Sequence, residues 1–267
     1  MATIDHQLIG YKMKNYVISL TSALDRRKHI EREFGKQQVE FEFFDAITPD
    51  TVKLKIHQLL PNICIDRISL GELACCVSHM VLWQHAIDQN MSHIAIFEDD
   101  IFLGEHAQHF LMQSDWLHAD WDIVKLETFY ERTFIEKSST DVLSRQVSRL
   151  NASHFGAAGY ILSNAAIQKI FQTLRSSHNL SPIDHILFSN QESLFGKLNI
   201  QQLSPALCIQ EKILKDKTNL SNALDIYRQQ WRPPKEKMNF YKKILREFHR
   251  LAKQIRFFLF AQVISFK

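Results

Sequence analysis

Three consecutive carboxylates, Glu98, Asp99 and Asp100, follow a short apolar segment at residues 93–97. Like charges this close repel one another and raise one another's pKa unless a cation or hydrogen-bond donors compensate them. Magnesium and manganese ions prefer such oxygen ligands and usually share them with substrate phosphates. The alternative is a solvated acidic turn in which Asp99 caps the next helix. Because the run directly follows an apolar strand, it favours a divalent-cation site.

The segments around this run predict alternating strands and helices. A strand at 16–20, a helix at 24–34 and a strand at 40–46 argue for a parallel sheet with helices on its faces. Ser69, with Glu72 three residues later, predicts a capping box at the start of a long helix over 70–89. Further strands are expected at 93–97, 122–126, 155–162 and 207–209, and further helices at 164–174 and 183–188. Ligands bind beyond the carboxyl ends of strands in such sheets, which is where the three carboxylates lie.

Several short motifs occur in an order that resembles one enzyme family. They are YVISL (16–20) with Arg26-Arg27, FFDA (43–46), LGEL (70–73) with Ser78-His79, IFEDD (96–100), GAAGY (156–160), PID (182–184) and PALCIQ (205–210). Each motif alone is weakly specific, but the ordered set covers residues 15–210 and resembles the family-25 glycosyltransferases, especially bacterial lipooligosaccharide galactosyl- and glucosyltransferases. The resemblance implies an α/β fold of the glycosyltransferase A type with a mainly parallel sheet, a UDP-hexose donor, a divalent cation (Mn²⁺ or Mg²⁺) and inversion at the anomeric carbon.

The same resemblance suggests which residues hold the metal. Asp100 is the first candidate, with Glu98 or Asp99 contributing directly or through water. Gln210 is expected as a third ligand or a phosphate contact. The acidic motif of this fold class usually begins with Asp, whereas this chain has Glu98. The resemblance therefore does not decide which of the three carboxylates touches the metal directly.

An inverting transfer also needs a base for the acceptor hydroxyl and contacts that align the donor. Asp184, near the start of a short helix, is the preferred base, and Asp99 and Glu127 are the competitors. The alternative role for Asp184 is that of an ordinary helix N-terminal aspartate. Donor contacts are expected from residues that follow the first two strands or lie on the long helix: Ser19, Leu20, Arg26, Asp45, Ser78 and His79. For Arg26 the alternative is a solvated helix face, and for His79 a buried, hydrogen-bonded histidine.

The overall composition is that of a folded protein of 267 residues, with 45% hydrophobic and 23% charged residues. The four cysteines show no zinc-ribbon or redox spacing. Residues 1–14 lack the apolar core of a signal peptide, and no uncharged apolar run of about 18 residues occurs. We therefore expect a cytoplasmic protein.

The charge is distributed unevenly along the chain. Residues 235–267 contain nine Lys or Arg and two Glu, a net charge of +7, so the rest of the chain carries −4 of the total of +3. We expect a catalytic domain at 1–215, a linker at 216–234 and a basic amphipathic helical tail at 235–267. Such a tail suits the anionic inner face of the cytoplasmic membrane. The alternative is a helix that docks on the body of the enzyme or on a second copy in a homodimer.

Other classes of function fit the sequence less well than a transferase does. Nucleic acid is disfavoured as a partner because the body is acidic and no recognition motif accompanies the tail. A metal-dependent phosphohydrolase or nuclease would need more ligand acids or histidines in motif spacing. A non-catalytic membrane-bound scaffold is disfavoured by the intact acidic run and Asp184. The resemblance to the family-25 glycosyltransferases implies metal-dependent, inverting transfer of galactose or glucose from a UDP-sugar to a lipooligosaccharide or lipopolysaccharide core.

Overall fold

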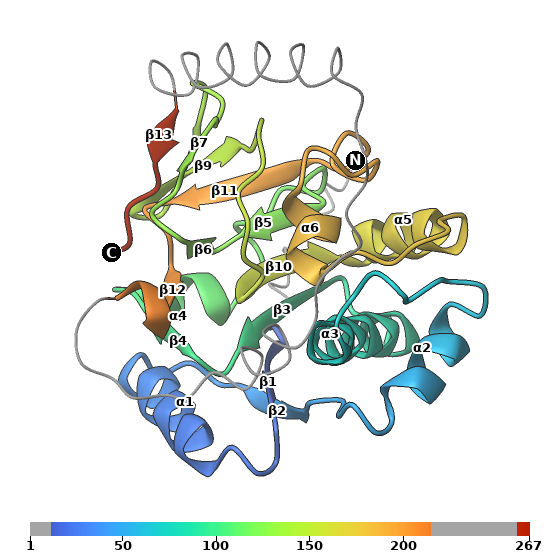
Figure 1. The fold of residues 1–267 in the computed structure, drawn as a ribbon. Coiled ribbons are helices and arrows are strands. Elements are labelled where there is room, and N and C mark those ends of the chain that lie inside the picture. Colours follow the sequence, from blue (N-terminus) through green and yellow to red (C-terminus); the bar gives the residue numbers. More distant parts are fainter. Residues whose placement is uncertain (1–11, 215–260) are drawn as a thin grey trace, which may run out of the picture.

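An eight-stranded sheet forms the centre of the protein (Figure 1). The structure is a computed structural model that describes residues 12–214 and 261–267. The strands are arranged in the order β2-β1-β3-β10-β5-β11-β9-β8. Their bounds are β1 (Asn15–Ser19), β2 (Glu42–Asp45), β3 (His93–Glu98), β5 (Ile123–Lys125), β8 (Thr140–Val142), β9 (Arg145–Arg149), β10 (Gly159–Ser163) and β11 (Ile200–Ser204).

The sheet is mixed, whereas we predicted a mainly parallel one. β1 pairs in parallel with β2 and β3, and β5 pairs in parallel with β11. The other four of the seven pairings are antiparallel, because β10 and β9 run against their neighbours. Because β10 is antiparallel to β3 and β5, the chain enters this strand from the end at which β3 and β5 finish.

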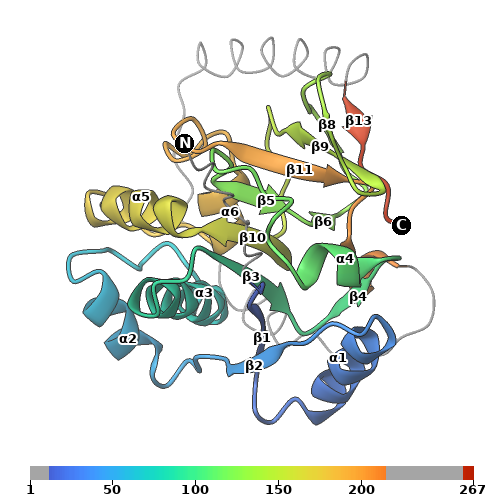
Figure 2. The ribbon, with the colours of Figure 1, turned by 180° about the vertical axis from the view of Figure 1, so that it is seen from behind.

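Helices cover both faces of the sheet (Figures 1 and 2). The helices are α1 (Leu24–Lys36), α2 (Val52–Leu59), α3 (Leu70–Asp88), α4 (Ala107–Leu111), α5 (Asn164–Arg175) and α6 (Ile183–Phe188). The core residues of α2, α3, α5 and α6 form one apolar cluster, and those of α1 and α4 form a second. β3 supplies Ile94 and Ile96 to the first cluster and Ala95 and Phe97 to the second, as the period of two in a strand requires. Continuing this alternation, Glu98 faces α3.

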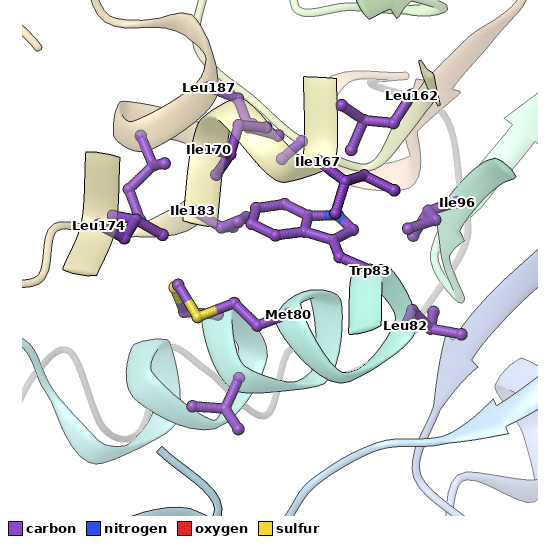
Figure 3. Close-up of a cluster of buried hydrophobic side chains, with 14 of the residues drawn as sticks. Met80, Leu82, Trp83, Ile96, Leu162, Ile167, Ile170, Leu174, Ile183 and Leu187 are labelled. Atoms are coloured by element: carbon purple, nitrogen blue, oxygen red, sulfur yellow. The ribbon is translucent and has the colours of Figure 1, made fainter. Parts of the chain in front are cut away.

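Trp83 of α3 fills the centre of the first cluster (Figure 3). Ile96 of β3, Leu162 of β10 and Ile167 of α5 lie around its ring, which is fully buried. Its Nε1 donates a hydrogen bond of 3.1 Å to the hydroxyl of Tyr160, so the polar atom of the indole has a partner. This contact joins α3 to β10 beneath the carboxyl end of β3.

Two smaller sheets extend the molecule beyond the carboxyl ends of β3 and β5. One contains β4 (Ile101–Leu103), β12 (Cys208–Gln210) and β6 (Glu127–Thr128), and the other contains β7 (Arg132–Thr133) and β13 (Gln262–Val263). Because β4 follows β3 after a turn of two residues, the three-stranded sheet holds the acidic run against β12.

The described end of the predicted tail is extended and packs on the body. The predicted linker at 216–234 and residues 235–260 of the tail lie outside the described residues. At 261–267 the prediction of a helix is wrong: β13 pairs with β7, and Ile264 is buried. Backbone hydrogen bonds to the rest of the protein explain the extended conformation, including one of 2.6 Å from Ala206 N to Ser265 O. They pair backbone groups that an edge strand would otherwise leave without partners. No helix in the described part of the chain is both long and apolar enough to cross a membrane.

The capping box predicted for the long helix is confirmed. The Ser69 side chain accepts from the backbone N–H of Glu72 at 3.3 Å, and the Glu72 carboxylate accepts from the backbone N–H of Ser69 at 3.4 Å. These bonds fix the first turn of α3. Cys75 and His79 lie on the same helix, one and two turns further along.

Replacing Ser69 with Ala should therefore lower the free energy of unfolding by about 1 kcal/mol, because the first turn of α3 loses its side-chain acceptor. Urea denaturation measures this change. Ser176→Ala, at an exposed position after α5, is the control and should change stability by less than about 0.5 kcal/mol. Equal stabilities of the two variants would contradict the capping role.

Candidate functional site

The three carboxylates lie where several chain segments converge. Glu98 ends β3, and Asp99 and Asp100 form the turn into β4. The parallel register aligns Ile18 of β1 with Glu98, and Ser19 with Asp45 of β2. The carboxyl ends of three neighbouring strands therefore meet at one edge of the sheet, as predicted from the order of the elements.

Asp99 is held on both carboxylate oxygens. Ser19 Oγ donates to Oδ2 at 2.7 Å, and Arg26 Nη1 donates to Oδ1 at 2.6 Å. Burial alone would lower the pKa of Arg26, but the charges of Asp99 and Asp100 raise it, so the guanidinium stays protonated. The structure thus brings Ser19, Arg26 and Asp99 together and joins α1 to the end of β3. Its contacts give Asp99 a positioning function, while its role as a base stays a prediction.

Asp100 is buried and incompletely satisfied. Its Oδ1 has no hydrogen-bond partner. Burial, together with the negative charges of Glu98 and Asp99, raises the pKa of Asp100 to about 7, against the opposing effect of Arg26 and Lys212. A buried acceptor without a donor is costly, and a cation would relieve the cost. Asp100 therefore offers a free oxygen ligand at the sheet edge.

Gln210 reaches the same place from β12. Its Nε2 donates to Glu98 Oε2 at 3.3 Å, and its Oε1 is buried without a partner. β12 is placed by its pairing with β4, in which Gln210 lies opposite Ile101. Three residues predicted as metal ligands thus converge, and two of them present unpartnered oxygens. Carboxylate and amide oxygens are the donor set that fits Mg²⁺ or Mn²⁺.

On its other side, Glu98 faces α3. The distance from Glu98 Oε1 to Cys75 Sγ is 3.7 Å, and that to His79 Nε2 is 3.8 Å. His79 is fully buried, and its Nδ1 lies 2.7 Å from the hydroxyl of Tyr160. Burial alone would raise the pKa of Glu98, but His79, Lys212 and the thiol of Cys75 lower it, so Glu98 is ionised.

Other residues predicted to contact the donor make contacts within the protein. Ser78 is fully buried, accepts from Ile47 N at 2.8 Å and donates to Ala74 O at 2.7 Å. Arg27 donates to the carboxylate of Asp45 and, at 3.2 Å, to the carbonyl of Leu20. The side chain of Asp45 remains 65% exposed and so can still be reached from solvent. The donor-binding roles of these residues stay predictions.

A second buried charge cluster contains Lys125 and Glu127, which are both fully buried. Glu127 Oε2 accepts from Ala158 N at 2.8 Å and lies 3.7 Å from Lys125 Nζ. Burial raises the pKa of Glu127 to about 8, although Lys125 acts to lower it. Lys125 also donates to the carbonyls of Phe155 and Gly156. This cluster therefore fixes the segment that leads into β10.

The segment held by Lys125 contacts Asp184. Gly156 N donates to Asp184 Oδ2 at 3.5 Å, and His185 N donates to Asp184 Oδ1 at 3.0 Å. Gly156 has a φ of +90°, and a Cβ there would lie 2.1 Å from the ring of Phe129, so only glycine fits. Asp184 is half-buried and is thus more accessible than Glu127.

Three residues of the site were missed by sequence reasoning: Cys75, Lys125 and Lys212. The signal for Cys75 was its spacing of four residues from His79, which places both on one face of a helix. The signal for Lys125 was a charged residue inside an otherwise apolar strand. Lys212 carried no such signal, because its influence on Glu98 and Asp100 depends on the pairing of β12 with β4.

Comparison with known proteins decides the family of the chain. The model of glycosyltransferase family 25, described as an LPS biosynthesis protein, matches residues 12–187, which is more than half of the sequence. The chain belongs to glycosyltransferase family 25. The resemblance seen in its ordered motifs is thereby confirmed. The match includes the acidic run, the α3 residues that face it, and Asp184.

Two similar proteins of known name align over most of the chain. The lipooligosaccharide biosynthesis protein lic2B of Haemophilus influenzae is 34% identical over 273 residues, covering 95% of this chain and 99% of that protein. The lacto-N-neotetraose biosynthesis glycosyltransferase LgtB of Neisseria meningitidis serogroup A is 38% identical over 209 residues, covering 74% of this chain and 75% of that protein.

The buried Asp100 predicts a pH effect on the stability of this family-25 enzyme in the absence of metal. Because its pKa rises from 3.8 to about 7 on folding, the folded protein keeps a proton that the unfolded chain loses between about pH 4 and pH 7. Asp100 therefore makes stability fall as pH rises through that window. Between pH 5 and pH 8 the free energy of unfolding of the native protein should fall by on the order of a few kcal/mol more than that of the Asp100→Asn variant.

Urea denaturation with EDTA at both pH values measures this difference. Asp141→Asn, at an exposed position of β8, is the control and should follow the native protein. An Asp100→Asn variant with the same pH dependence as the native protein would contradict the raised pKa.

Proposed function

We propose that this glycosyltransferase transfers galactose or glucose from a UDP-sugar to a lipooligosaccharide or lipopolysaccharide core, with inversion and with a divalent cation. The observation that best supports the proposal is the convergence of Glu98, Asp100 and Gln210 at one sheet edge, with unpartnered oxygens on two of them. Such an arrangement at the carboxyl ends of β1, β2 and β3 agrees with a nucleotide-sugar site of the glycosyltransferase A type.

In this proposal the donor diphosphate lies next to the acidic run. Bound Mn²⁺ or Mg²⁺ supplies positive charge that stabilises the leaving diphosphate. Asp100 and Gln210 would hold the ion, with Glu98 between Gln210 and α3. Arg26, fixed by Asp99, and Lys212, exposed after β12, add positive charge from the protein. Guanidinium groups suit the phosphate because they donate two parallel hydrogen bonds.

Asp184 is the carboxylate best placed to accept the proton of the acceptor hydroxyl. Its carboxylate receives two backbone N–H donors, which orient it, and it is half-buried. Asp99 already accepts from Ser19 and Arg26 on its two oxygens. Glu127 is fully buried against Lys125. A base must reach the proton that it removes, so the accessible carboxylate is preferred.

The names of the relatives support an acceptor of this class. One is named for lipooligosaccharide biosynthesis and another for lacto-N-neotetraose biosynthesis. An enzyme that extends a lipid-linked glycan benefits from lying on the membrane that holds its acceptor. The net charge of +7 over residues 235–267 supports such binding at the inner face of the cytoplasmic membrane.

Metal-dependent binding of UDP tests the proposed donor site. UDP should bind in isothermal titration at least tenfold more tightly with Mn²⁺ than with EDTA, because an ion held by Asp100 would supply positive charge next to the diphosphate. Asp100→Asn should abolish this metal-dependent gain, whereas Asp141→Asn should keep it. Metal-independent binding of UDP by the native protein would contradict the proposal, and hydrolysis of phosphodiesters without UDP would favour a phosphohydrolase.

A second prediction separates catalysis from donor binding. Asp184→Asn should lower kcat by about 10²–10⁴-fold, since a general base contributes this much, and leave the affinity for UDP and Mn²⁺ within about twofold of the native value. Transfer to a lipooligosaccharide acceptor measures kcat. Asp66→Asn, at an exposed position in the loop before α3, is the control. Full activity of Asp184→Asn would contradict the role of Asp184 as the base and would favour Asp99 or Glu127.

A third prediction concerns the membrane. Replacing Lys242, Lys243 and Arg246 with Gln should weaken sedimentation with vesicles rich in anionic lipid by at least tenfold, because each basic residue contributes about 1 kcal/mol. These substitutions leave 261–267 and its contacts with the body unchanged. Turnover of a soluble acceptor should be retained. Vesicle binding equal to that of the native protein would contradict membrane attachment through this segment.

A further inference from the structure

Cys75, His79 and Glu98 form a compact group of three potential metal ligands. Cys75 and His79 lie one turn apart on α3, and Glu98 ends β3 opposite them. One ligand atom from each residue lies within 4.8 Å of the other two. Among the His, Cys, Asp and Glu residues that the structure describes, no other group of three meets this condition. Sequence reasoning did not find the group, because its third member comes from a different element.

Hydrogen bonding leaves one of these atoms, His79 Nε2, without a partner. His79 Nε2 is fully buried and has no hydrogen-bond partner. It lies 3.8 Å from Glu98 Oε1, which is too long for a hydrogen bond. Cys75 Sγ lies 3.7 Å from the same oxygen, which is at best a weak contact. A buried imidazole nitrogen without a partner thus lies close to a carboxylate oxygen and a thiol, both of which can bind a metal ion.

Two of the three distances between these atoms are close to those around a tetrahedral ion. With zinc–ligand bonds of ordinary length, two ligand atoms on a tetrahedral Zn²⁺ are about 3.4–3.6 Å apart. The two distances to Glu98 Oε1, 3.7 and 3.8 Å, exceed this by a few tenths of an ångström. Cys75 and Glu98 are only partly buried, so an ion can enter and keep a fourth position open.

The charges and the surrounding contacts fit as well. A thiolate, a carboxylate and a neutral imidazole together neutralise a divalent ion. His79 Nδ1 is held at 2.7 Å from the hydroxyl of Tyr160, which Trp83 fixes in turn. Such a partner on the second ring nitrogen commonly orients a histidine that binds metal. When the ion binds, His79 carries its proton on Nδ1 and Cys75 releases one proton to solvent.

We propose that Cys75, His79 and Glu98 bind Zn²⁺ or a similar thiophilic divalent ion at a site distinct from the hard-ion site of Asp100 and Gln210. A sulfur ligand selects softer ions than Mg²⁺ or Mn²⁺. The two sites share only Glu98, whose Oε1 faces α3 and whose Oε2 faces Gln210. The inference does not depend on the identity of the sugar donor or acceptor.

Cobalt titration of the full-length, EDTA-treated protein tests the site. Co²⁺ bound to a thiolate gives a ligand-to-metal charge-transfer band in the near ultraviolet, which histidine and carboxylate ligands do not give. The native protein should bind one Co²⁺ per chain with this band, and Zn²⁺ should remove it by competition. Cys75→Ser should abolish the band, and Glu98→Gln should weaken binding at least tenfold. Circular dichroism verifies that each variant is folded.

Two control variants sharpen the result. Cys64→Ser changes another partly buried cysteine and should keep the band. Asp100→Asn should also keep it while losing metal-dependent UDP binding, so that failure of this proposal and failure of the proposed function are distinguishable. Absence of the band from the native protein, its persistence in Cys75→Ser, or its loss in Asp100→Asn would overturn the proposal.

Discussion

Mutual repulsion of the three carboxylates at the end of β3 is the constraint on which the rest of the site depends. Each carboxylate is compensated differently. Asp99 is held by Ser19 and Arg26. Glu98 lies between Gln210 and the polar face of α3. Asp100 keeps an oxygen without a partner and a pKa raised by burial and by its neighbours. Among the three carboxylates, Asp100 is therefore the one that we propose as the main ligand of the cation.

The fold supplies these compensations from distant parts of the chain. β1 and α1 supply the two side chains that hold Asp99. Cys75 and His79 come from α3, and His79 is fixed through Tyr160 and Trp83. β12 brings Gln210, and its pairing with β4 also places Lys212 near the acidic run. The buried pair of Lys125 and Glu127 holds residues 155–158 next to Asp184. Under the proposed function, substrate binding and proton transfer belong to separately fixed groups around one strand end.

Local patterns predicted the parts of this arrangement that local interactions determine. The capping box of Ser69 and Glu72, the helix that it starts, and the position of the acidic run after an apolar strand were all predictable. The reversed direction of β10, the hydrogen bonds that hold Asp99, and the approach of Cys75 to Glu98 were not, because each depends on which distant segments pair. The extended end at 261–267 was missed for the same reason, since Ala206 and β7 determine it.

Anomalous diffraction from crystals grown with UDP and Mn²⁺ would locate the proposed ion independently of turnover. We expect a manganese peak within bonding distance of an Asp100 carboxylate oxygen and next to the diphosphate. A manganese ion bound elsewhere, with Asp100 Oδ1 still unpartnered beside bound UDP, would contradict the proposal.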